Sequence, residues 1–92
     1  MSNRLHGRLT IHGSKTIASS HEFTLVVEPW AEEYIIHPED EVALIAVGKY
    51  SSGWFAVSQS RDHLLVWPEF DSPIYYQFWR NGVLEDESNN PS

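Results

Sequence analysis

Apolar and polar side chains alternate along the first third of this chain, as they do in a β-strand that buries one face. Between residues 4 and 12, Leu5, Gly7, Leu9 and Ile11 occupy every second position, and basic, histidine or threonine residues lie between them. Residues 22–28 repeat the alternation. Because successive side chains of a strand point to opposite faces, both segments predict half-buried strands.

The two segments are joined by a connection rich in glycine and serine. If they pair as an antiparallel hairpin, His6 faces Glu28 and His12 faces Glu22. Such pairs attract only when the imidazole is protonated, so they contribute little at neutral pH.

Six more short strands are expected further along the chain. They span residues 34–37, 41–48, 54–60, 64–67, 74–80 and 83–85. Pro38 and Pro68 are expected to end the first and the fourth of these, because proline lacks a backbone N–H donor. The unbroken apolar run within residues 41–48 indicates a strand that is buried on both faces near the centre of a sheet.

The dipeptide Asn81-Gly82 is the clearest local signal. Both residue types tolerate the positive φ angles of a two-residue type I′ turn, so a hairpin is expected around it. In that hairpin Arg80 lies opposite Val83, and Trp79 lies opposite Leu84.

Eight short strands without a sustained helical periodicity predict an all-β fold. We expect a two-layer antiparallel β-sandwich or a flattened barrel. A chain of 92 residues suffices for one domain, which we place at residues 1–84. Residues 85–92 read "EDESNNPS" and are expected to be an acidic, disordered tail.

Composition argues against several classes of protein. The chain has no cysteine, so disulfides and thiolate metal sites are excluded and a cytoplasmic location is expected. Its longest apolar run, "VALIAV", is too short to span a membrane, and no signal peptide is expected. A net charge of −7 argues against a nucleic-acid surface, because phosphate binding requires clustered Lys and Arg.

Acidic residues gather between residues 28 and 41, namely Glu28, Glu32, Glu33, Glu39, Asp40 and Glu41. Their spacing does not match an EF-hand loop, so no metal ligand and no cofactor is assigned. A solvated loop is the main interpretation, since two exposed carboxylates in water repel by only about 1 kcal/mol at about 4 Å. Recognition of a basic partner and a calcium or magnesium site are the alternatives.

No segment carries a motif that specifies a reaction. Ser58, Ser60, Asp62 and His63 are close in sequence, but no nucleophile-elbow motif is present. Gly48-Lys49 lacks the upstream glycine of a phosphate-binding loop. We therefore expect a protein that is not an enzyme.

The segment Glu28-Pro29-Trp30, followed by "AEEY", resembles a segment of small bacterial proteins of about this length. The resemblance implies an all-β domain and carries no functional residues. Ala31 stands where glycine is commoner in that segment, which leaves the type of turn open. The stretch "IIHPEDEVALIAV" is also similar to the beginning of a strand in cupredoxin-type sandwiches, but without cysteine a blue-copper site is excluded.

Aromatic side chains are the strongest functional signal, with four Trp, four Tyr and four Phe. Within residues 74–80, Tyr75, Gln77 and Trp79 share one face, and the opposite face is left for the core. Amphipathic aromatics are favoured at protein interfaces and on sugar-binding platforms, and cross-strand packing in the core is the alternative. The expected interaction surface comprises Trp30, Glu32, Glu33, Tyr34, Tyr75, Gln77 and Trp79.

Two functions from different classes follow. The preferred hypothesis is a non-catalytic interaction module that contacts a protein partner or a second copy of itself as a homodimer. Self-association through residues 74–80 is its simplest form, because an exposed apolar strand invites pairing. The alternative is a small-ligand domain in which exposed tryptophans stack on carbohydrate. The sequence identifies neither the partner nor the ligand.

Overall fold

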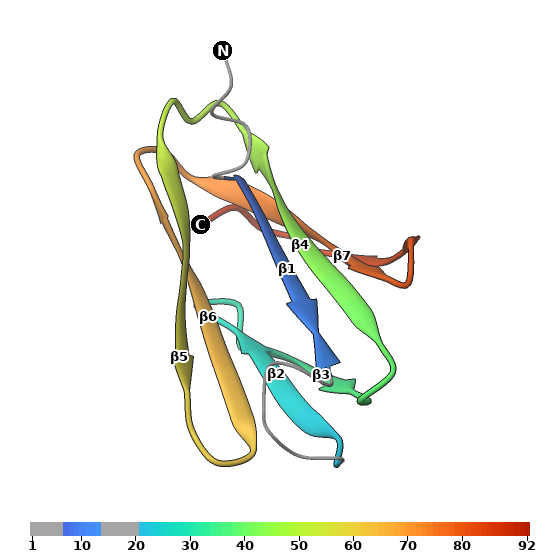
Figure 1. Cartoon of the computed structure of the whole chain (residues 1–92). Coiled ribbons are helices and arrows are strands. Elements are labelled where there is room, and N and C mark those ends of the chain that lie inside the picture. Colours follow the sequence, from blue (N-terminus) through green and yellow to red (C-terminus); the bar gives the residue numbers. More distant parts are fainter. Residues whose placement is uncertain (1–6, 14–20) are drawn as a thin grey trace.

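The computed structural model describes residues 7–13 and 21–92, which form eight strands in two stacked sheets (Figure 1). Sheet A has the order β1 (Arg8–His12), β4 (Glu41–Gly48), β7 (Ile74–Arg80) and β8 (Val83–Glu87). Sheet B has the order β3 (Glu32–Ile36), β2 (Phe23–Val27), β6 (His63–Phe70) and β5 (Gly53–Gln59). The predicted all-β sandwich is confirmed, although one strand pair, β2 with β6, is parallel.

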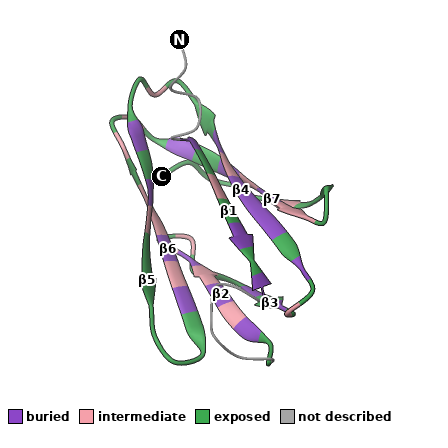
Figure 2. Ribbon diagram, viewed as in Figure 1, coloured by how far each residue is buried: buried purple, intermediate pink, exposed green. Residues whose placement is uncertain are grey.

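The core lies between the sheets and is built from alternate residues of their strands. Figure 2 shows buried positions separated by intermediate or exposed ones along the strands. Burying one large apolar side chain contributes about 1.5–3 kcal/mol, so this alternation holds the layers together. The largest fully buried side chains come from both sheets: Leu25, Val27, Ile36, Val42, Leu44, Val66, Ile74, Tyr76 and Phe78.

The first two strands do not form a hairpin with each other. β1 pairs with β4 in sheet A, whereas β2 lies in sheet B between β3 and β6. His12 is therefore opposite Glu41, with 3.9 Å between Nε2 and Oε2, and not opposite Glu22. The second pair considered, His6 with Glu28, is not tested because His6 lies outside the described residues. Two strands that each bury one face can lie in opposite layers as readily as side by side, and their alternation does not distinguish these arrangements.

The central position predicted for residues 41–48 is confirmed, because β4 lies between β1 and β7. Val42, Ala43 and Leu44 are consecutive and all buried, but the expected burial on both faces is wrong for the rest of the strand, where Ile45 on the outer face is only partly buried. Further along β4, Val47 is exposed on the outer face.

Pro38 and Pro68 behave differently. β3 ends before Pro38, as predicted, but β6 continues through Pro68 to Phe70. On the side of β6 that faces β2, the N–H of Glu28 donates to the Val66 carbonyl. Backbone groups of alternate residues point to the same side of a strand, so those of Pro68 point to this side as well. Since β2 ends at Val27, no ladder hydrogen bond is required from Pro68.

The Asn81-Gly82 hairpin has the predicted register, with Arg80 opposite Val83 and Trp79 opposite Leu84. Its turn residues have φ angles of 51° and 84°, as a type I′ turn requires. The structure differs from the expected tail, because β8 continues to Glu87. Beyond it, Ser92 exchanges two backbone hydrogen bonds with Ile74, so the chain stays paired with β7 after residue 84.

Candidate functional site

The seven residues expected to form one surface lie in two regions. Tyr75, Gln77 and Trp79 are on the outer face of sheet A. The others belong to β3 and the turn before it, where Glu32 and Glu33 are exposed. Tyr34 is buried in the core, and Trp30 packs edge-on against Tyr76, with 4.8 Å between ring centroids.

The outer face of sheet A brings side chains from all four of its strands into rows. One row contains Thr10, Ala43, Trp79 and Leu84, and the next contains Arg8, Ile45, Gln77 and Glu87. A third pairs Val47 with Tyr75. The apolar members of these rows form what we call the sheet A patch: Ile45, Val47, Tyr75, Trp79 and Leu84.

The sheet A patch is accessible to solvent. Val47, Tyr75 and Leu84 retain 43 %, 44 % and 39 % of their exposed surface. Trp79 is partly buried, and its indole N–H donates to Oε1 of Gln77 at 3.0 Å, which orients the ring. Next to Trp79 lies a hollow of about 370 Å³ whose lining includes Thr10 and Ala43. Small side chains on β1 and β4 thus leave space beside a large one on β7.

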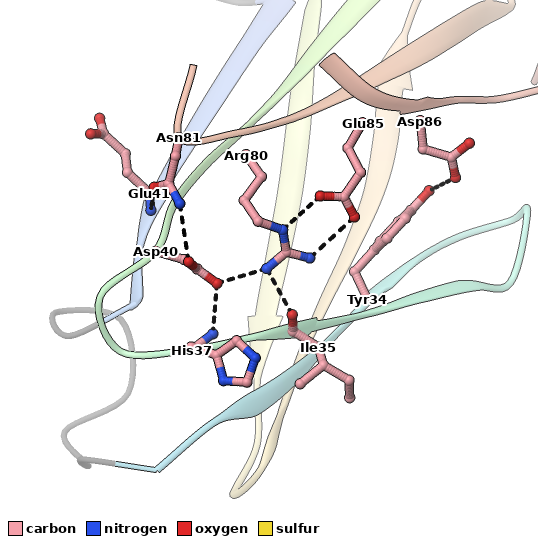
Figure 3. A network of polar contacts seen from close by, with 9 residues as sticks. All are labelled: Tyr34, Ile35, His37, Asp40, Glu41, Arg80, Asn81, Glu85 and Asp86. Carbon is pink, nitrogen blue, oxygen red and sulfur yellow. Dashed lines mark hydrogen bonds and ion pairs between the residues drawn. The ribbon is translucent and has the colours of Figure 1, made fainter. Parts of the chain in front are cut away.

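Arg80 anchors the hairpin that carries Trp79 and Leu84 (Figure 3). Its Nη1 donates to Oδ2 of Asp40 at 2.7 Å and to the Ile35 carbonyl at 2.9 Å, and its Nε donates to Glu85 at 2.7 Å. Since Ile35 belongs to β3, this guanidinium ties the two sheets together. It also pairs with Asp40 of the acidic segment 28–41 and with Glu85 of the expected tail, so these two acids have a structural role.

The carboxylate of Asp40 accepts three hydrogen bonds. Burial opposes its ionisation, but donors on His37, Asn81 and Arg80 outweigh that effect and lower the pKa of Asp40. Arg80 in turn has its pKa raised, chiefly by the hydrogen bond to Glu85. Both groups are therefore charged at neutral pH, which favours a stable ion pair over an acid–base role.

A second polar chain crosses the core between β3 and the β7–β8 hairpin. The hydroxyl groups of Tyr34 and Tyr76 are 2.6 Å apart, and Tyr34 donates to Oδ2 of Asp86 at 2.7 Å. Tyr76 is therefore the donor to Tyr34. Burial raises the pKa of Tyr34 and raises that of Tyr76 to about 12, so both phenols stay protonated at neutral pH.

The fold also brings together two acidic segments that are far apart in the sequence. Glu32 and Glu33 on β3 lie on the same side of the sandwich as Asp86 and Glu87 on β8, because Tyr34 joins these strands. Within residues 7–13 and 21–92, no three His, Cys, Asp or Glu side chains are grouped so that they could hold a metal ion. Ser58, Ser60, Asp62 and His63 lie in or beside the exposed β5–β6 turn.

The sequence pattern does not indicate that β4 contributes to the sheet A patch or that β1 borders it. Ile45 and Val47 belong to the run that was interpreted as buried on both faces, and Arg8 was one of several outward residues of the first strand. Their outward positions are visible in the alternation, but only the strand order places them beside Trp79.

Comparisons of the chain with protein-family models, curated proteins and solved structures find no match. The part of the chain that the structure describes contains no helix long and apolar enough to cross a membrane.

Proposed function

We propose that this protein is a non-catalytic β-sandwich module that self-associates as a homodimer through the outer face of sheet A. The observation that carries the proposal is the sheet A patch, a continuous set of apolar and aromatic side chains from β4, β7 and β8. The core is already filled from the inner faces of both sheets. Contiguous exposed apolar surface of this kind is typical of interaction sites.

The order of side chains within the rows favours a second copy of this chain as the partner that covers the sheet A patch. Arg8 lies at one edge of its row and Glu87 at the other, with Ile45 and Gln77 between them. A two-fold axis parallel to the strands, between β4 and β7, places β7 of one protomer over β4 of its partner. Arg8 of each protomer then lies opposite Glu87 of the other, so the two-fold axis forms two equivalent ion pairs, one at each edge of the interface.

The same axis also matches shapes. It keeps each row at its own height, so Trp79 of one protomer lies over the hollow beside Ala43 of the other. In the third row Val47 lies over Tyr75. Stacked sheets of this kind pack about 10 Å apart with mean strand directions within about 30° of each other, a range that includes the parallel arrangement given by this axis. A four-stranded face is about 19 Å wide, which is small for an interface, so we expect a weak dimer.

The test is sedimentation equilibrium over a range of protein concentrations, using charge reversal. Arg8→Glu and Glu87→Arg should each weaken association, because like charges meet across the axis, and the double variant should restore it. Trp54→Ser, which removes an exposed tryptophan from sheet B, is the matched control and should associate like the wild type. A strictly monomeric wild type at the highest concentration, or a double variant no stronger than the singles, refutes the proposal.

A second candidate function, carbohydrate binding, is supported by Trp54. This side chain is 58 % exposed on the outer face of sheet B, where its ring is accessible for stacking on a sugar. Titration of the protein with a panel of soluble glycans should quench tryptophan fluorescence, and Trp54→Ser should abolish the quenching. If no glycan changes the emission, this candidate fails.

A further inference from the structure

A second hollow lies where β6 runs beyond the end of β2. β2 stops at Val27, whereas β6 continues to Phe70, so among the described residues the last part of β6 has a ladder neighbour in β5 alone. The hollow beside this free edge has a volume of about 480 Å³. Its lining comprises Glu28, Pro29, Trp67, Pro68, Phe70, Asp71, Ser72, Pro73 and Ser92.

The charged side chains around this hollow are both carboxylates, whereas Ser72 and Ser92 add hydroxyls that can donate or accept. Pro68 directs its backbone toward the free edge, and because proline has no N–H it offers only its carbonyl there. Glu28 and Asp71 add two carboxylates, and no Lys or Arg is among the lining residues. A ligand that donates hydrogen bonds and carries positive charge complements this set.

Asp71 is held in place as a charged acceptor. Its carboxylate accepts from the Ser51 N–H at 2.9 Å and from the Ser51 hydroxyl. The hydrogen bond from the Ser51 side chain is the main cause of a lowered pKa for Asp71, so this group is ionised at neutral pH.

The apolar part of the lining suits an aliphatic chain. Three proline rings and Trp67 contribute to the walls. The Trp67 indole N–H donates to Oε2 of Glu69 at 2.9 Å, which orients the ring. An indole face also attracts a cation. A lysine side chain, with a four-carbon stem and a terminal ammonium group, combines the two properties that this lining requires.

We propose that this hollow is a binding site for a lysine side chain presented by a protein partner. The site is separate from the sheet A patch, so it does not depend on the dimer. Carbohydrate is the less suitable ligand, because a neutral sugar carries no positive charge to complement Glu28 and Asp71.

The test uses the full chain, labelled with ¹⁵N, and the probe Nα-acetyl-lysine N-methylamide. Saturable shifts are expected at the Trp67 indole N–H and at the amide of Asp71. The neutral analogue Nα-acetyl-norleucine N-methylamide has a similar stem without the charge and should bind at least several-fold more weakly.

Two variants test the carboxylates separately. Glu28→Gln and Asp71→Asn should each weaken lysine binding about two- to fivefold, the range of an exposed ion pair. Glu39→Gln removes the same charge from the β3–β4 turn, far from the hollow, and should leave binding unchanged. Glu28→Gln is the safer variant for folding, since Asp71 also holds Ser51.

Three outcomes would overturn the proposal. One is equal binding of the norleucine and lysine probes, which would show that charge is not recognised. Another is a loss of lysine binding in Glu39→Gln as large as in Glu28→Gln, which would show that Glu28 is not a specific contact. The third is a set of shifts at Trp67 produced by methyl glucoside but not by the lysine probe, which would assign the hollow to a sugar.

Discussion

Asp40→Asn is expected to lower the free energy of unfolding by about 2 kcal/mol at neutral pH. Asp40 accepts from the His37 N–H at 3.0 Å, from Arg80 Nη1 at 2.7 Å and from Asn81 Nδ2 at 3.2 Å. An amide has one acceptor oxygen, so at least one donor loses its partner, and the bond from Arg80 loses its charge assistance. Each loss is worth about 1 kcal/mol.

Arg80 limits the cost of this substitution. Removing one partner of an isolated buried ion pair costs about 3–5 kcal/mol, because the remaining charge is left uncompensated. Here the guanidinium keeps Glu85 and the Ile35 carbonyl as acceptors, so the smaller value is expected.

The lowered pKa of Asp40 determines how the effect depends on pH. A carboxyl group with a lower pKa in the folded chain stabilises the fold above its unfolded pKa of about 3.9, and this contribution is lost as the pH falls through the folded pKa. Protonated Asp40 resembles asparagine in shape and charge. The difference between wild type and Asp40→Asn should therefore be complete at neutral pH and decrease below about pH 4.

Urea unfolding, followed by tryptophan fluorescence at several pH values, measures this difference. A loss of about 2 kcal/mol corresponds to a decrease in Tm of roughly 8–16 °C for a domain of this size. Glu39 is exposed and lies next to Asp40 in the sequence, so Glu39→Gln is the control. Its free energy of unfolding should stay within about 0.5 kcal/mol of the wild-type value. A difference that is absent at neutral pH, or that stays constant down to about pH 2, would refute the role given to the Asp40 carboxylate.

Three further substitutions test other parts of the fold, each by thermal and urea unfolding. Tyr34→Phe should lower the free energy of unfolding by about 2 kcal/mol, because Asp86 loses a donor and the Tyr76 hydroxyl loses its acceptor. A change under about 0.5 kcal/mol would show that these hydrogen bonds do not stabilise the fold. Ala31→Gly should stabilise the protein by about 0.5–1 kcal/mol, because Ala31 has a φ of 61°, which glycine adopts without strain; a destabilised variant would contradict this. Gly82→Ala should lower the free energy of unfolding by about 1–2 kcal/mol through its φ of 84° alone, since an added Cβ meets no atom of the described residues within 4 Å. An unchanged Tm would contradict this.

Much of the local structure could be predicted because strand geometry is encoded by neighbouring residues. Alternation, short apolar runs and turn residues together identified all eight strands, and alternation identified the inward face of β7, where Ile74, Tyr76 and Phe78 are buried. Asn81-Gly82 specified both the turn and its register, since the φ angles depend on these two residues.

The candidate site was predicted only in part. Tyr75 and Trp79 were expected on the outer face of their strand and lie there, but Trp30 and Tyr34 are parts of the core. Tyr34 is apolar over most of its surface, and the hydrogen bond to Asp86 lets its hydroxyl be buried. That partner is 52 residues away along the chain, so no local pattern could indicate it.

The sequence by itself determined which segments extend and which side chain of each points inward, because these properties depend on alternation over a few residues. Only the tertiary structure decided that β1 pairs with β4, that Asp40 meets Arg80, and that β6 passes through Pro68. Each of these depends on which strands become neighbours. Strand order is set by the combined packing of both sheets, and an alternating segment fits many neighbours equally well.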